Sequence, residues 1–172
     1  ADPQGDWSSA MIALDGSIIA QGPKGRRTIA VRDFVTGPFQ NALASNEIAI
    51  EAVIPPAKGI RAGGYLKLER RIGDFATAGV AVALEFSGAS VIRAGIGLTG
   101  VGSATINAID AAQSLVGSAL TSQAIERAAD LAAQAAQPRS DHRGSAAFKK
   151  QVVRTFVARM LTEASSNQVK AA

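Results

Sequence analysis

The sequence predicts an α+β fold in which a three-stranded antiparallel sheet packs on a bundle of three helices. Two observations carry this prediction. Residues 64–98 contain apolar segments of strand length, and turn residues such as Ser87-Gly88-Ala89 separate them. Residues 106–165 instead contain helix-capping residues and apolar residues spaced three and four apart.

The first predicted strand brings polar side chains together on one face of the sheet. Leu66 and Leu68 point to one face, because successive side chains of a strand alternate. We expect the last helix to cover this face. The other face then presents the Tyr65 phenol, the Lys67 ammonium and the Glu69 carboxylate, which suits a polar aromatic ligand. The strands are predicted at residues 64–70, 76–86 and 90–98.

Three helices are predicted after the sheet, at residues 107–116, from 121 or 122 to 137, and from 145 to about 165. Ser145 is expected to cap the third helix. This helix carries a wide apolar stripe that predicts core positions at Phe148, Val152, Phe156 and Met160, flanked by Val153, Val157 and Leu161. Its basic side chains are expected on a solvated surface, at Lys149, Lys150, Arg154 and Arg159.

Residues 1–60 are predicted to be the tail of a larger domain, because their strands are short and poorly suited to forming a domain alone. Asp15-Gly16 is expected to form a hairpin turn, and Gly22-Pro23-Lys24-Gly25 a second turn. Residues 47–54 alternate as a further strand, and Pro55-Pro56 ends it.

A glycine run in the third strand, Gly95-x-Gly97-x-x-Gly100, contains the dinucleotide-binding spacing G-x-G-x-x-G. That fingerprint needs a helix directly after it, whereas residues 101–105 are typical of a loop. We therefore expect these glycines to permit close packing under a helix.

Composition excludes several classes of function. The chain has no Cys and one His, which excludes thiolate and iron–sulfur sites and argues against any metal site. The lack of Cys fits a reducing compartment, so we expect a cytoplasmic location. The net charge of +4 comes from scattered basic residues, so no nucleic-acid partner is expected. No apolar run reaches the roughly 20 residues that span a bilayer, and no catalytic nucleophile–base–acid set is visible.

The stretch from Tyr65 to Ala76 has the pattern Y-x-K-x-x-R-R-x-G-D-F-A. It resembles the FAD-binding medium subunit of molybdenum hydroxylases, a family that includes carbon monoxide dehydrogenase and the FAD portion of xanthine dehydrogenase. The resemblance covers the C-terminal half of that subunit. Further matching motifs, in the right order, are Ala1-Asp2-Pro3-Gln4-Gly5-Asp6, Gly37-Pro38, Asn46-Glu47-Ile48, Ile54-Pro55 and Asp141-His142-Arg143-Gly144-Ser145-Ala146.

The resemblance implies an FAD site with four contact residues and no catalytic residue. It places Lys67 at the N1/C2-carbonyl edge of the flavin ring and Tyr65 beside the ring. Asp6 resembles the residue that accepts hydroxyl hydrogen bonds near the ribityl or phosphate region. Ile48 matches an apolar position near the ring, and a place in the core is its simpler interpretation. Arg71 and Asp74 are expected to pair across their turn.

The resemblance also implies a function as an electron relay. Iron–sulfur 2Fe-2S clusters of a small subunit would pass electrons to FAD, after oxidation of substrate at the molybdopterin cofactor of a large subunit. Carbon monoxide dehydrogenase is the preferred family member. The implied division is a remnant of the FAD-binding lobe at 1–60, the C-terminal flavoprotein domain at 61–168 and a frayed tail at 169–172.

The family pattern is incomplete in this sequence, because its two Gly-rich phosphate-binding loops are not present. We therefore expect a fragment that retains no FAD alone and shows its four contact residues on an exposed, half-formed cleft. The alternative is a cofactor-free interaction module that docks the iron–sulfur and molybdenum subunits.

Overall fold

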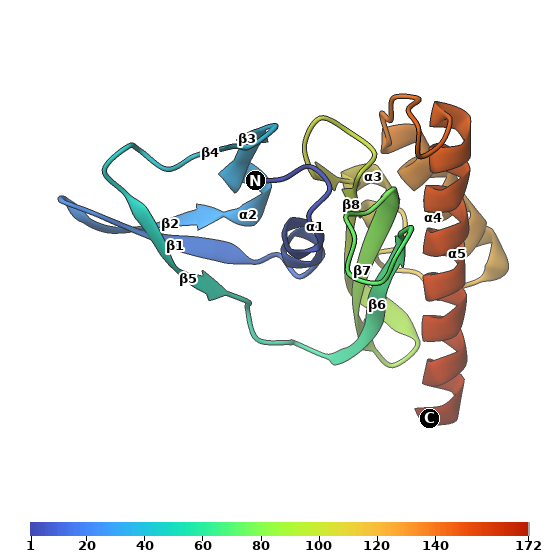
Figure 1. The fold of residues 1–172 in the computed structure, drawn as a ribbon. Helices are drawn as coiled ribbons and strands as arrows, with labels where there is room; N and C mark the ends of the chain where they lie inside the picture. The colour runs from blue at the N-terminus through green and yellow to red at the C-terminus, as the bar shows by residue number, and fades with distance from the viewer. Residues whose placement is uncertain (172) are drawn as a thin grey trace.

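The computed structural model describes residues 1–171, with side chains described for residues 1–166. The chain forms an N-terminal group of short strands, shown in blue to teal in Figure 1, and a C-terminal sheet with long helices. Helix α1, Asp6–Ala13, lies between the two parts.

The N-terminal part is built around a small antiparallel sheet of order β2-β1-β5. Its hairpin turns at residues 22–25, as predicted, and residues 48–53 form the expected further strand. The other elements are a short helix and a two-stranded ribbon. The elements are β1 (Ser17–Gly22), β2 (Gly25–Ala30), α2 (Val31–Phe34), β3 (Val35–Gly37), β4 (Gln40–Asn41) and β5 (Ile48–Val53).

The prediction of a hairpin turn at Asp15-Gly16 was wrong. These residues connect helix α1 to β1, and the Gly16 amide donates to the Met11 carbonyl at 2.8 Å. Asp15 adopts a left-handed conformation with a φ of 53°. The apolar residues before the turn are helical because Met11 and Ile12 fill a small core under β1.

The C-terminal sheet has the order β6-β7-β8-β9 and is antiparallel throughout. The three predicted strands are confirmed, and β9 adds a fourth strand of two residues. Ile106 and Asn107 pair with Leu98 and Gly97, because the chain after β8 turns back along that strand. The strands are β6 (Ile60–Leu68), β7 (Ala78–Ser87), β8 (Ser90–Thr99) and β9 (Ile106–Asn107).

Helices α4 and α5 cover one face of this sheet, and α1 lies on the other face (Figure 1). Thr121 accepts a hydrogen bond from the Ala124 amide at 3.2 Å and caps α4, and Ser145 caps α5 in the same way, as expected. The main core lies between the sheet and these helices, where Leu66 packs at its edge. The C-terminal helices are α3 (Ile109–Gln113), α4 (Ser122–Ala135) and α5 (Ala146–Ala171).

Helix α5 buries most of the predicted wide stripe, including Met160 and its flanking residues. Val153, Val157 and Leu161 are fully buried, whereas Phe156 is only partly buried and Phe148 is exposed. The expectation that Lys149 is solvated was wrong, because its side chain is buried against the connector before the helix. The helix continues to Ala171, past the start of the frayed tail predicted at 169–172. Residue 172 lies outside the described residues.

The close packing predicted at the glycine run is confirmed. A Cβ atom on Gly95 would lie 2.0 Å from the Ala13 carbonyl oxygen, and one on Gly97 would lie 2.2 Å from the Ser9 carbonyl oxygen. Both carbonyls belong to α1, so the helix backbone rests directly on β8. Because α1 covers this face and α5 covers the other, β7 is buried on both sides.

Candidate functional site

Three of the four predicted contact residues meet where α1 begins. Asp6 is the first residue of α1, and Tyr65 and Lys67 point toward it from β6. The Tyr65 hydroxyl donates to Asp6 Oδ1 at 2.8 Å, and Lys67 Nζ donates to Asp6 Oδ2 at 2.8 Å. One carboxylate therefore holds both side chains in place. Its negative charge is also favoured at the N-terminal end of a helix.

The Lys67 ammonium is enclosed by three acceptors. Besides Asp6, it contacts Glu69 Oε2 at 2.9 Å and donates to the Asp74 carbonyl at 2.9 Å. An ammonium has three donors, so the chain satisfies all of them. Hydrogen bonds to Asp6 and then to Glu69 raise the pKa of Lys67 above its ordinary value. Lys67 is therefore a fixed positive charge at neutral pH.

The Tyr65 hydroxyl is a protonated, neutral hydrogen-bond donor at neutral pH. Burial, followed by the hydrogen bond to Asp6, raises the pKa of Tyr65 well above its ordinary 10.0. Its position depends on Gly79 of β7, because a Cβ atom there would lie 2.9 Å from the Tyr65 hydroxyl oxygen. The site thus combines one cation, one neutral donor and one carboxylate that accepts from both.

The fourth predicted residue does not join this group. Ile48 lies on β5 in the N-terminal sheet and is 69% exposed, so the simpler interpretation of Ile48 as a core residue is wrong. The expected exposed cleft is not observed at Lys67 either. Its side chain is only 14% exposed, because Asp6, Glu69 and the loop carbonyl surround it.

An open apolar groove of about 440 Å³ runs from Tyr65 along β6 and β7 beside α1. Its lining is mainly alanine, glycine and backbone, together with Leu14, Arg61 and Tyr65, and a largely apolar concave surface of this kind is typical of small-molecule sites. Sequence reasoning missed this groove, although alternate glycine and alanine residues in β7 were a visible signal. The lining residues are Ala10 and Ala13 of α1, Leu14 just after it, residues 61–65 of β6 and residues 81–84 of β7.

The loop between β6 and β7 is held differently from the prediction. Arg71 contributes its backbone carbonyl, which accepts from the Asp74 amide at 3.0 Å, and the expected Arg71–Asp74 ion pair is not formed. Instead Asp74 Oδ1 lies 3.7 Å from Arg143 Nη2, and Arg143 Nη1 donates to the Phe75 carbonyl at 2.9 Å. Arg143 reaches the loop from the connector between α4 and α5, a contact that the local turn pattern cannot show.

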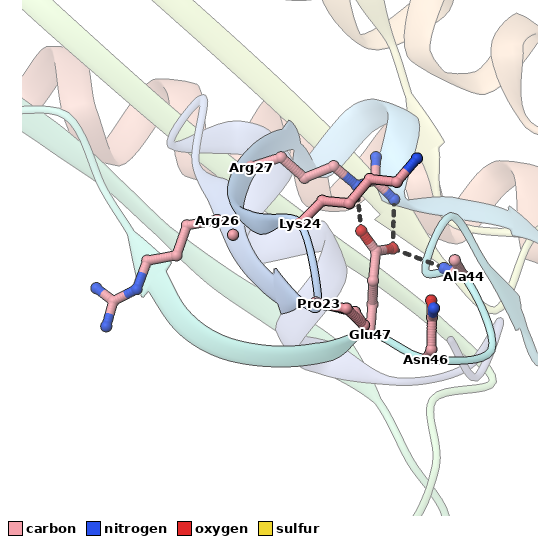
Figure 2. A pocket seen from close by; sticks show the side chains of 9 residues that line it. Pro23, Lys24, Arg26, Arg27, Ala44, Asn46 and Glu47 are labelled. Atoms are coloured by element: carbon pink, nitrogen blue, oxygen red, sulfur yellow. Dashed lines mark hydrogen bonds and ion pairs between the residues drawn. The ribbon is translucent and has the colours of Figure 1, made fainter.

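A second hollow, of about 360 Å³, lies at the β1–β2 hairpin in the N-terminal part (Figure 2). Figure 2 shows Arg27 directed toward Glu47, whereas Arg26 points away from it. Arg27 donates to both Glu47 carboxylate oxygens at 2.7 Å, and the Ala44 amide donates to Glu47 Oε2 at 2.7 Å. These bonds lower the pKa of Glu47 from 4.5 to about 2. Glu47 therefore clasps the hairpin to the chain before β5 and neutralises Arg27.

Other kinds of site find no support in the described part of the chain. Among residues with described side chains, no group of three or more His, Asp or Glu is arranged to hold a metal ion. No helix within residues 1–171 is long and apolar enough to cross a membrane.

Residues 64–164 match the C-terminal domain of CO dehydrogenase flavoproteins, and residues 1–57 match the FAD-binding domain of molybdopterin dehydrogenases. The first match covers the part with the C-terminal sheet and helices, and the second covers the N-terminal part. The chain belongs to the family of CO dehydrogenase flavoproteins, the FAD-binding components of molybdopterin dehydrogenases.

Characterised relatives support this membership. The chain is 35% identical to the carbon monoxide dehydrogenase medium chain of Afipia carboxidovorans over 167 residues, which is 96% of this chain and 57% of that protein. It is 32% identical to the nicotine 6-hydroxylase medium subunit of Paenarthrobacter nicotinovorans, covering 96% of this chain and 58% of the relative. The chain thus spans somewhat more than half the length of the relatives it matches.

Solved structures show the same fold. The crystal structure of the Cu,Mo-CO dehydrogenase in its cyanide-inactivated form matches with a TM-score of 0.89 and 36% identity, over 96% of this chain and 58% of that one. Quinoline 2-oxidoreductase from Pseudomonas putida 86 matches with a TM-score of 0.84 and 27% identity, over 98% of this chain and 58% of that one.

Proposed function

We propose that this chain forms the ring-side wall of the FAD site in the flavoprotein subunit of a molybdenum hydroxylase. The observation that carries the proposal is the meeting of Asp6, Tyr65 and Lys67 beside an apolar groove. In this proposal, residues 1–60 are the remnant of the FAD-binding lobe and residues 61–168 are the C-terminal domain.

The residues fit the chemistry of a flavin. The chemistry supplied by bound FAD is electron transfer, in which the reduced ring carries negative charge at its N1/C2-carbonyl edge. Lys67 is a permanent cation that stabilises such a charge. The small side chains of the groove, among them Ala81 and Ala83, leave room for a flat aromatic ring. Ile48 is the least supported of the four predicted contacts, because it lies on the other sheet.

Asp6 and Glu69 set the position of the Lys67 ammonium and raise its pKa. Asp6 holds the ammonium at 2.8 Å, and its carboxylate retains lone pairs that accept hydrogen bonds from ligand hydroxyl groups. Because all three Lys67 donors are used, contact with a ring carbonyl requires that carbonyl to replace or share one acceptor. Asp6 is the candidate, since its side chain is 46% exposed.

The whole subunit, in this proposal, passes electrons from 2Fe-2S clusters of a small subunit through FAD to an external acceptor. The large subunit would oxidise substrate at its molybdopterin cofactor. Carbon monoxide is the proposed substrate, although identities of 35% and 32% to medium chains of carbon monoxide dehydrogenase and nicotine 6-hydroxylase differ little. The substrate site belongs to another chain, so these residues do not select it.

Redox titration of the full-length, flavin-loaded protein tests the role of Lys67. Lys67→Met is expected to lower the flavin midpoint potential, because a charge-assisted contact of about 1.5–3 kcal/mol to the reduced ring is lost. Lys24→Met removes the same charge from the exposed β1–β2 hairpin and should leave the potential unchanged. An unchanged midpoint potential in Lys67→Met, with FAD still bound, would show that Lys67 does not act on the flavin ring.

A second candidate function is a cofactor-free interaction module that docks the iron–sulfur and molybdenum subunits. The satisfied donors of Lys67 favour it, because the polar group is complete without a ligand. Desalting of the purified 172-residue chain after incubation with FAD separates this candidate from a self-sufficient flavin site. We expect a flavin-to-protein ratio near zero, since the chain supplies a ring wall but no Gly-rich phosphate cradle. Capture of the iron–sulfur subunit by the colourless chain would support docking.

A further inference from the structure

The motif Asp141-His142-Arg143-Gly144 forms a braced turn between α4 and α5. Asp141 and Gly144 exchange backbone hydrogen bonds at 3.1 Å, and Asp141 Oδ1 accepts from the Arg143 amide at 2.9 Å. Asp141 Oδ2 accepts from Lys149 Nζ at 2.7 Å, and that lysine is only 2% exposed. Lys149 also donates to the Arg139 carbonyl at 3.1 Å. The backbone of Arg143 is therefore held against the first turn of α5 by these hydrogen bonds.

The Arg143 side chain leaves this turn and holds the loop between β6 and β7. Its Nη1 donates to the Phe75 carbonyl at 2.9 Å, while Nη2 lies 3.7 Å from Asp74 Oδ1. The Arg143 side chain is 16% exposed, so most of its own surface is covered even though Phe75 lies at the surface of the protein. A guanidinium suits this role because its planar fork presents two donors in a fixed geometry.

The peptide carbonyl next to this contact is the one that binds Lys67. The Asp74 carbonyl accepts from Lys67 Nζ at 2.9 Å, and the Phe75 amide of the same peptide unit donates to Asp74 Oδ1 at 2.8 Å. Arg143 thus holds the residues on both sides of that peptide plane. A tilt of the plane would move the carbonyl away from the ammonium.

The rest of the loop has little other support. Within the described residues, the hydrogen bonds of residues 70–75 otherwise stay inside the loop or go to Glu69 at its stem. Ile72 is fully exposed, and Gly73 takes a left-handed φ of 85°. Of the described side chains beyond the stem, Lys67 and Arg143 are therefore the two that hydrogen-bond to residues 70–75, and the loop returns to the sheet at Ala76, whose amide donates to the Gln4 carbonyl at 3.4 Å.

We propose that Arg143 is a positioning residue that fixes the Asp74 carbonyl on Lys67, and through it the placement of the Lys67 charge. The inference rests on the proposed role of Lys67 at the flavin ring. It assigns a function to residues 141–144 of the connector, which have no role in the proposed ring-side wall.

The test is a double-mutant cycle on the flavin midpoint potential of the full-length, flavin-loaded protein. Arg143→Gln, in otherwise unchanged protein, is expected to shift the potential in the same direction as Lys67→Met and by a smaller amount. In the Lys67→Met background, Arg143→Gln is expected to cause no further shift, because the residue it positions is gone. Arg143→Lys should restore part of the shift, since it keeps one donor but not the fork.

A matched control separates positioning from the loss of a charge. Arg139→Gln removes the same charge from an exposed position of the same connector and should leave the potential unchanged. Equal shifts for Arg139→Gln and Arg143→Gln, or a shift that persists in the Lys67→Met background, would overturn the inference. If Arg143→Gln does not fold, Arg143→Lys carries the same comparison at reduced size.

The failure of the proposed function and the failure of this inference give different experimental results. No effect of Lys67→Met on the potential would contradict the role of Lys67 at the ring, and would overturn both. A shift for Lys67→Met together with none for Arg143→Gln or Arg143→Lys would leave the flavin wall intact and overturn the positioning role alone.

Discussion

The two faces of the C-terminal sheet differ in the size of the side chains they present. The face under α4 and α5 carries large apolar residues, including Leu84 and Phe86 of β7 and Leu98 of β8. The face under α1 carries glycine and alanine in the corresponding rows, including Gly79 and Gly97. The large side chains of the first face form the buried core under α4 and α5. Small ones allow a helix backbone to lie directly on the second face, which places Asp6 over Tyr65 and Lys67.

The largest effect is expected on the face with large side chains. Leu161 is fully buried on α5, and Leu161→Ala is expected to destabilise the protein by about 2–5 kcal/mol. Phe156→Ala should cost less than Leu161→Ala, because Phe156 is only partly buried. Urea unfolding of both variants measures the difference. A larger cost for Phe156→Ala would mean that α5 turns the Phe156 side of its apolar stripe toward the sheet.

The small-residue face is expected to resist even one added methyl group. A Cβ atom at Gly97 would lie 2.2 Å from a backbone oxygen of α1, so Gly97→Ala must displace the helix, at about 1–3 kcal/mol. Gly64→Ala is the matched control on the other face, where the nearest atom, Met160 Sδ, lies 4.0 Å away. That variant should be nearly neutral in the same unfolding assay. Equal costs would show that α1 does not rest on β8.

The contrast between the faces also explains what the sequence could predict. The strands of the sheet follow from apolar segments of strand length between turn residues, and the start of α5 follows from its cap, so both were predicted correctly. Helix α1 was missed because it has only eight residues and is stabilised by packing against glycines far along the chain. The buried position of Lys149 was missed because its partner Asp141 belongs to the preceding connector.

The candidate site was predicted only in part. The alternation of β6 placed Tyr65, Lys67 and Glu69 on one face, and the structure confirms that Lys67 and Glu69 are in contact. The hydrogen bond from Tyr65 to Asp6 joins residues 59 positions apart, so no local spacing reveals it. Ile48 was selected by resemblance to a motif, whereas the same motif supplies Glu47, which clasps the β1–β2 hairpin.

The smallest expected effect lies in the N-terminal part, away from both faces. The lowered pKa of Glu47 means that the folded state binds its proton less tightly than the unfolded state, so the clasp stabilises folding above pH 4.5. This contribution is expected to disappear as the pH falls from 4.5 through about 2. Urea midpoints at several pH values should show Glu47→Gln losing part of this dependence.

Glu51→Gln provides the control for the acid titration, because Glu51 is an exposed carboxylate on β5, four residues after Glu47. It should retain the pH dependence of the unchanged protein. A pH profile of Glu47→Gln that matches that of Glu51→Gln would contradict the clasp.

The most direct test of the polar wall on the α1 face is an ultraviolet titration of the chain, because it contains a single tyrosine, Tyr65. Burial and the bond to Asp6 raise the pKa of Tyr65, so no tyrosinate absorbance should develop near pH 10 while circular dichroism shows the fold intact. Asp6→Asn should lower the titration midpoint without restoring the ordinary value of 10.0, since burial remains the larger cause. Tyrosinate formation centred at pH 10 in the unchanged, folded chain would contradict the account.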